Sequence, residues 1–213
     1  DDDEIVGEEC KHVIEALAVL RERRACDAIV THFDDDDVHT TAVAAMVAIG
    51  YLPPLLTALS DANTRIRLGA LTAIRRMADG DAIPALQSSM ESADIDEREK
   101  IVRAYSSIGI QAHPCLIEAL SDDAKVVQLA ALQGLALDRG ETLMLRLIEM
   151  AGDPDADVRL AAIDAMQRFS DGRVVAPLAA ALDDDDVRIS RQARRSLDHL
   201  ESVVARKGTE SDQ

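Results

Sequence analysis

Apolar residues recur along most of this chain with the spacing of an amphipathic helix, and the same arrangement returns about every 30 residues. The clearest copy is Asp153–Ser170, where an Asp-rich turn with Pro154 precedes a helix with one apolar face. We take Val158 as position zero of that helix. Equivalent positions follow at steps of roughly 28 to 31 residues: Val38, Ile66, Glu97, Val127, Val158 and Ile189. This period is typical of repeat proteins.

Three further columns stay in register with position zero. Four places on, the residues are Ala42, Ala70, Ile101, Ala131, Ala162 and Ala193. Seven places on, they are all small: Ala45, Ala73, Ala104, Gly134, Ala165 and Ser196. Eight places on, they are all large and apolar: Met46, Ile74, Tyr105, Leu135, Met166 and Leu197. These positions share one face of a helix. We expect the small column to allow close approach of a neighbouring helix, and the large column to fill the space beside it.

Each copy is predicted to form a helix A, an acidic turn and a helix B. We expect the A helices near Arg24–Phe33, Leu52–Leu59, Ala82–Met90, Ala112–Leu120, Glu141–Met150 and Val174–Leu182. We expect the B helices near Val38–Ile49, Thr64–Ala78, Ile95–Ile108, Lys125–Leu137, Ala156–Phe169 and Val187–Ala205. The acids before helix B are suited to cap it and to complement its dipole. The prediction is an all-α chain of about 12 or 13 helices.

The repeats are predicted to form one domain, residues 1–206, followed by a disordered polar tail, residues 207–213. Its repeats lie near residues 24–50, 51–80, 81–109, 110–140, 141–172 and 173–205. Residues 8–24 read as an N-terminal capping helix with Val13, Leu17 and Leu20 on its apolar face. The first residues, up to Glu4, are charged and are expected to fray.

The composition favours close helix packing and an unusual solvent. Aromatic residues are only 2%, which argues against a β-sandwich. The formal net charge is −17, with 40 acidic and 23 basic residues, and nearly all the basic residues are Arg. This resembles proteins of salt-loving microbes, halophilic archaea in particular, because small acidic side chains keep a surface hydrated in concentrated KCl. The alternative is an ordinary acidic protein of a mesophile.

The cysteines and the hydropathy indicate a reducing, aqueous compartment. Cys10, Cys26 and Cys115 have no CxxC or metal-binding spacing, as is common in the cytosol. No apolar run approaches the 18 residues of a membrane span, and no signal peptide is visible. We therefore expect a cytoplasmic protein without a membrane partner, and a monomer.

The order "Leu, acidic turn, Val-Arg, Ala-Ala" resembles the short HEAT repeats, in particular those of the phycocyanobilin-lyase type, over roughly Arg24–Leu200. The resemblance implies a right-handed α-solenoid of the armadillo/HEAT type with about six helical hairpins. In that family an Asp and an Arg six residues apart tie adjacent turns by a ladder of hydrogen bonds. The matching pairs here are Asp61 with Arg67 and Asp153 with Arg159.

Two features depart from this pattern. The Arg of the pair is replaced by Gln128 after Asp122 and by Ser190 after Asp184, so we expect an incomplete ladder. The copy at Glu97 carries a charge at the apolar zero position, which makes its A–B turn the least regular.

Catalytic motifs are absent from the sequence. There is no P-loop, GxGxxG or GxSxG. The five histidines are scattered and none precedes Glu, which excludes the His-Glu pairs of HEAT-repeat di-iron hydroxylases. The acidic runs 34–37 and 183–186 could bind Ca²⁺ or Mg²⁺ weakly, but neither has EF-hand spacing, and solvated helix caps are the simpler interpretation. We predict no catalytic residue, no metal and no cofactor.

Arginines at exposed positions of helix B form the one candidate binding surface. They are Arg75, Arg76, Arg103, Arg168 and Arg195. Helix B is expected to line the concave side of a HEAT-type stack, so these arginines would form a basic stripe inside an acidic rim. The alternative is that they pair with Asp79, Asp164 and Asp198 on the same helices.

Three functions follow from these patterns. The leading hypothesis is a non-enzymatic scaffold or adaptor that binds another protein on the concave face, because solenoids offer extended surface and this chain has no catalytic set. By family analogy alone, the chain would be a bilin lyase or a lyase-like chaperone. The third is nucleic-acid binding, as in HEAT-like alkylpurine glycosylases, which the net charge of −17 opposes.

Overall fold

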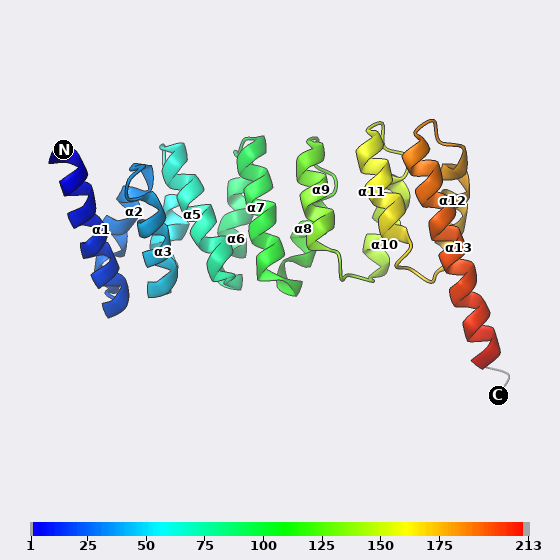
Figure 1. The fold of residues 1–213 in the computed structure, drawn as a ribbon, viewed down its shortest axis with the longest axis horizontal. Coiled ribbons are helices and arrows are strands. Elements are labelled where there is room, and N and C mark those ends of the chain that lie inside the picture. The colour runs from blue at the N-terminus through cyan, green and yellow to red at the C-terminus, as the bar shows by residue number, and fades with distance from the viewer. Residues whose placement is uncertain (1, 211–213) are drawn as a thin grey trace. The chain divides into compact units, whose positions relative to one another are not determined.

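The computed structural model describes residues 2–210, with side chains described for residues 7–203. Its contacts divide the chain into two compact units, residues 1–116 and 117–213. Residues 2–210 contain thirteen α-helices and six short 3-10 helices, and no β-strand (Figure 1). The predicted all-α architecture is therefore confirmed over the described part of the chain.

The first unit holds seven whole helices. They are α1 (Asp2–Leu20), α2 (Cys26–Thr31), α3 (His39–Ile49), α4 (Pro53–Ala58), α5 (Thr64–Met77), α6 (Ile83–Met90) and α7 (Ile95–Ile108), with 3-10 turns η1 (Arg23–Ala25), η2 (His32–Asp34), η3 (Gly80–Ala82) and η4 (Ile110–Ala112). Each A helix packs on its own B helix, as α4 does on α5 and α6 on α7. The B helices also pack on one another, α3 on α5 and α5 on α7, so they lie side by side in Figure 1.

Helix α8 (His113–Ala119) crosses the boundary between the units, and the second unit continues in the same pattern. Its helices are α9 (Lys125–Gly134), α10 (Glu141–Met150), α11 (Ala156–Met166), α12 (Val175–Ala180) and α13 (Val187–Glu210), with η5 (Gly172–Val174) and η6 (Ala181–Asp183). Helices α10 and α12 pack on α11 and α13, and α11 packs on both α9 and α13.

The core is built from the repeated columns. All six residues four places after position zero are buried. In the small column only Gly134 is half-buried, and in the large column only Leu197 is. The repeated columns thus form the buried side of the B helices.

Two expectations about the ends need correction. In α1 the residue that packs inward is Ile14, whereas Val13 and Leu20 are 59% and 75% exposed. Helix α1 packs on α3, so its buried face is narrower than the sequence pattern indicates. Helix α13 extends to Glu210, so residues 207–210, which we expected in a disordered tail, are helical, and residues 211–213 lie outside the described part. The single domain of residues 1–206 stays a prediction.

No helix among residues 2–210 combines the length and the hydrophobicity that a membrane crossing requires.

Candidate functional site

Three of the acidic turns before the B helices, those at Asp61, Asp153 and Asp184, share one local structure. The first Asp of the turn accepts a hydrogen bond from the backbone N–H two residues later, as Asp153 does from Asp155 at 2.8 Å. That second residue then caps helix B: Asp155 accepts from the N–H of Asp157 at 2.9 Å. The turn at Asp184 repeats both bonds, to the N–H groups of Asp186 and Arg188. Asp side chains favour such turns because they satisfy backbone donors that the helix start leaves free.

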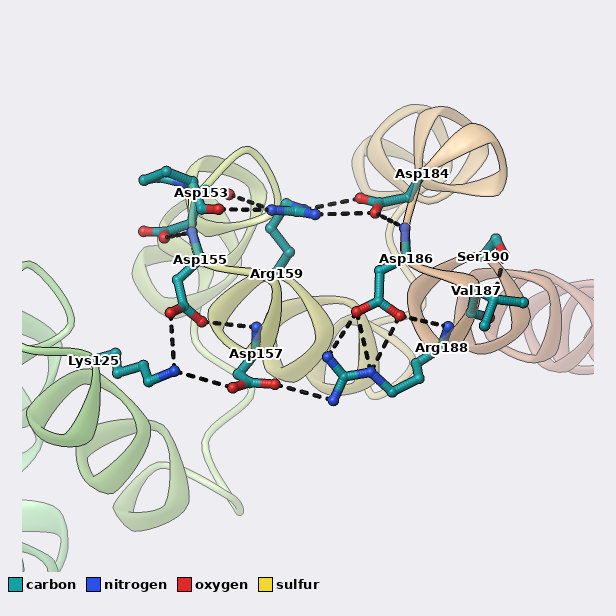
Figure 2. Close-up of polar contacts among 11 residues, drawn as sticks. Lys125, Asp153, Asp155, Asp157, Arg159, Asp184, Asp186, Val187, Arg188 and Ser190 are labelled. Atoms are coloured by element: carbon teal, nitrogen blue, oxygen red, sulfur yellow. Dashed lines mark hydrogen bonds and ion pairs between the residues drawn. The ribbon is translucent and has the colours of Figure 1, made fainter.

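Arg159 joins two of these turns. Its Nη1 donates to the carbonyl oxygens of Asp153 and Pro154 in its own turn, at 2.9 and 3.1 Å. Its Nε and Nη2 donate to the two carboxylate oxygens of Asp184, at 2.9 and 3.0 Å (Figure 2). Both side chains are mostly buried, with 19% and 13% exposed. A paired fork on a carboxylate is among the strongest polar contacts between side chains.

A second, more exposed line of ion pairs runs beside it. Lys125 donates to Asp155 and Asp157 of the next repeat, at 3.0 and 3.1 Å. Arg188 reaches back to the other oxygen of Asp157 at 3.1 Å and pairs with its own turn through Asp186 (Figure 2). Gln128 stands where other repeats have the ladder Arg. In its place, Lys125 links this repeat to the next one.

These contacts change the acidity of the turn. The hydrogen bond from Arg159 holds the pKa of Asp184 below its ordinary value, and Arg188 does the same for Asp186. Lys125 lowers the pKa of Asp155 and, together with Arg188, that of Asp157. Among the described residues no group of three His, Cys, Asp or Glu side chains is placed to hold a metal ion. In the acidic run 183–186, Asp184 is bound by Arg159 and Asp186 is bound by Arg188.

The irregular copy at Glu97 has a compensating partner in the first unit. Arg67 donates to the carbonyl oxygens of Asp61 and Ala62 in its own turn, as Arg159 does. Its Nε and Nη2 both contact Oε1 of Glu97, at 2.8 and 2.6 Å. The turn of that copy has Ser92 at the place of the usual Asp, and Glu97 supplies the missing carboxylate from position zero of helix B.

The predicted arginines of the first unit lie on the exposed side of α5 and α7. Arg75 and Arg76 are exposed, and within the described chain neither forms a hydrogen bond or an ion pair. Arg103 pairs with Glu99 at 2.6 Å on its own helix. Arg75 and Arg103 line a cleft of about 190 Å³ between α5 and α7, together with Lys100. The alternative, a pairing of Arg75 or Arg76 with Asp79, is not found among the described residues.

The predicted arginines of the second unit differ from one another. Arg195 is exposed on α13. Arg168 is half-buried, and its Nη1 donates to the carbonyl oxygens of Leu135 and Ala136 at the end of α9, at 3.3 and 2.5 Å. Burial lowers the pKa of Arg168. Its guanidinium caps a neighbouring repeat, which limits the donors it offers to a partner.

A family model described as HEAT repeats matches residues 52–136 and 113–198, which together span most of the chain. This chain belongs to the HEAT-repeat family. No curated protein matches its sequence.

Solved structures show the same α-solenoid repeat fold. An archaeal HEAT-like repeat protein from Thermococcus onnurineus is 15% identical over 93% of this chain and 98% of its own, with a TM-score of 0.56. A designed armadillo repeat protein in complex with the peptide (KR)4 is 15% identical over 82% of this chain and 98% of its own, with a TM-score of 0.54. The complex of CpcE and CpcF of phycocyanin lyase from Nostoc is 19% identical over 90% of this chain and 88% of its own, with a TM-score of 0.43.

Sequence reasoning missed several cross-links between these HEAT repeats. Lys125 and Arg188 precede position zero of their helices, so their contacts depend on the path of long side chains rather than on a repeated spacing. The partner of Glu97 had a visible signal: Ser92 replaces the turn Asp five residues before a Glu at an apolar position.

Proposed function

We propose that this HEAT-repeat protein is a non-enzymatic scaffold or adaptor that binds another protein through the exposed face of its B helices. The observation that carries the proposal is the state of Arg75 and Arg76. Both are exposed cations, and neither is paired within the described residues, although the chain has a net charge of −17. Most other cations near the turns are already held by carboxylates, as Arg159 and Arg188 are.

The cleft between α5 and α7 gives this surface a shape. It is lined by Leu71, Thr72, Arg75, Glu99, Lys100 and Arg103. Arg is enriched at interface hot spots because its planar fork pairs with carboxylates and its stem buries apolar area. A partner that fits this surface presents an acidic or mixed patch. Arg103 can exchange Glu99 for a partner carboxylate without leaving a buried charge, because both side chains are partly exposed.

We also propose that Arg195 of the second unit contacts a partner, and that Arg168 takes part through its apolar stem as much as through its charge. We further propose that the protein works in the cytoplasm, as a monomer, and without nucleic acid. The designed armadillo repeat protein with bound (KR)4 supports the general point that solenoid repeats of this class can present a peptide-binding surface. The bilin-handling alternative gains no comparable support, because the solved lyase complex is similar only at a TM-score of 0.43.

The proposal is tested by affinity capture from a native extract in high salt, followed by mass spectrometry. The bait carrying Arg75→Ala and Arg76→Ala is compared with the unchanged protein. A matched control bait carries Arg21→Ala and Arg24→Ala, which removes the same charge from two exposed arginines outside the B helices. We expect a partner that the control retains and the Arg75/Arg76 variant loses. Retention of every captured protein by the Arg75/Arg76 variant would contradict the proposed surface.

A further inference from the structure

A cavity of about 580 Å³ lies within the first unit, between the second and third repeats. Its walls come from α4 and α6, from the turns that follow them and from the first two turns of α5 and α7. They combine apolar side chains, four serines and three charged residues, Asp61, Arg67 and Glu97. Its volume falls in the range of pockets that bind small molecules.

Glu97 is the buried charge in this cavity, with only 6% of the residue exposed. Arg67 contacts only the Oε1 atom of Glu97, and no residue of the described chain forms a hydrogen bond with the Oε2 atom of Glu97. No fully buried polar side-chain atom in the described part lacks a hydrogen-bond partner. The free Oε2 therefore cannot be fully enclosed by protein, and the open space beside Glu97 is the cavity.

Arg67 does not offer a charge to a ligand. Its Nε and one Nη2 contact go to Glu97, and its Nη1 donates to the carbonyls of Asp61 and Ala62. Its remaining Nη2 contact is the hydroxyl of Thr64 at 2.8 Å. All three nitrogens of the guanidinium thus have partners within the protein. The formal charge of the lining is −1, because Asp61 and Glu97 each carry a negative charge and Arg67 carries one positive charge.

The third repeat carries a charge where the other five copies are apolar. Five of the six copies have Val or Ile at position zero, and the third has Glu97. A buried ion pair seldom adds stability over an apolar pair, because desolvation offsets the attraction. Because Arg67 contacts only Oε1, the second oxygen of this carboxylate is available to a ligand in the cavity. The neighbouring Ser88 and Ser89 add hydroxyl groups to the wall of the cavity.

We propose that this cavity binds a small organic cation, an ammonium or guanidinium on a short aliphatic stem. The cationic head lies at Oε2 of Glu97 with Asp61 and the serine hydroxyls around it. The stem packs on Leu56, Leu59 and Ile101. This site shares only Leu71 with the cleft that Arg75 and Arg103 line, and its charged groups, Glu97, Asp61 and Arg67, are not part of that cleft, so either proposal can fail without the other.

Agmatine is the probe, because it carries a guanidinium and an ammonium on a four-carbon stem. Isothermal titration calorimetry of the full chain at low salt compares it with 1,4-butanediol, which is neutral, and with valerate, which is anionic. We expect agmatine to bind with a Kd of about 1 mM or tighter, and the two other compounds to bind at least ~10-fold more weakly. Equal heats for agmatine and butanediol would overturn the proposal.

Two variants separate the cavity from general attraction to an acidic surface. Glu97→Gln keeps the shape and removes one of 40 acidic charges, and it should weaken agmatine binding at least ~10-fold. The double variant Ser88→Leu with Ser89→Leu fills the cavity and leaves the Arg67–Glu97 pair in place. It decides the question if Glu97→Gln does not fold.

The matched control is Ser106→Leu with Ser107→Leu on α7. In both serine pairs one residue is exposed, the other half-buried, and each hydroxyl donates to the carbonyl four residues earlier. We expect the control to bind agmatine like the unchanged protein and the Ser88/Ser89 variant to lose binding. Unchanged binding by the Ser88/Ser89 variant would place any agmatine site elsewhere and contradict the inference. The Arg75/Arg76 variant should bind agmatine normally, which keeps this result distinct from that of the partner surface.

Discussion

The guanidinium of Arg159 donates two hydrogen bonds, of 2.9 and 3.0 Å, to the two carboxylate oxygens of Asp184 in the next repeat. The same side chain holds two carbonyl oxygens of its own turn. One arginine thus fixes the position of two successive turns. The acidic rim of the second unit, meaning the turns 153–157 and 183–186, is therefore in part structural.

The first prediction concerns this pair. Asp184→Asn removes the charge, leaves Arg159 mostly buried without its counter-ion, and should destabilise the protein by about 1–3 kcal/mol. Asp185→Asn, one residue away and exposed, should change the free energy of unfolding by about 0.5 kcal/mol or less. Urea unfolding of the two variants measures both values. Equal effects would mean that the Arg159–Asp184 contact does not contribute.

The second prediction concerns acid. The pKa of Asp184 in the folded protein lies below its ordinary value of 3.8, and Arg173 lowers the pKa of Asp171 to about 2. A group with a depressed folded pKa stabilises the protein above its unfolded pKa, and this contribution is lost as the pH falls through the folded value. The urea midpoint should therefore fall as the pH drops from about 4 toward 2.

The control for the acid prediction is again Asp184→Asn. This variant lacks one of the titrating carboxylates, so its urea midpoint should depend less steeply on pH below about 4. Parallel curves for the variant and the unchanged protein would show that Asp184 has the same pKa folded and unfolded.

The third prediction concerns the small column. Ala165 is buried where α11 meets its neighbours, so Ala165→Leu should destabilise by roughly 1–3 kcal/mol through overpacking. Ala179→Leu makes the same chemical change at an exposed position of α12 and should have an effect within about 0.5 kcal/mol. Denaturant melts of the two proteins give the comparison. A small effect at Ala165 would contradict the packing of the column.

The repeated columns explain why the B helices could be predicted closely from the sequence. Their period depends on buried side chains, and the structure buries them. The contacts of Glu97 and Arg168 were harder to predict, because each depends on where a long side chain meets a different repeat. Arg168 was expected to be as exposed as Arg76, but its position near the end of α11 brings it to the carbonyls that end α9.

The fourth prediction concerns salt. The chain carries a net charge of −17, and exposed acids such as Asp35, Asp36 and Asp185 lie within a few residues of other acids. At ~1 M salt the Debye length is about 3 Å, so this repulsion is screened while the mostly buried Arg159–Asp184 pair is affected less. We expect the melting temperature to rise between 0.1 and 2 M KCl. A flat or falling melting temperature would count against it.

The central claim is that the B-helix arginines bind a partner while the acidic rim serves the fold. The most direct measurement is the Kd of a captured partner for two double variants, Arg75→Ala with Arg76→Ala and Asp183→Asn with Asp185→Asn. The rim variant leaves the two acids held by Arg159 and Arg188 untouched, so its fold is expected to survive. We predict that the arginine variant weakens binding by about 2 kcal/mol or more, roughly 30-fold, and that the rim variant binds normally. The opposite result, a rim variant that loses the partner and an arginine variant that keeps it, would contradict the account.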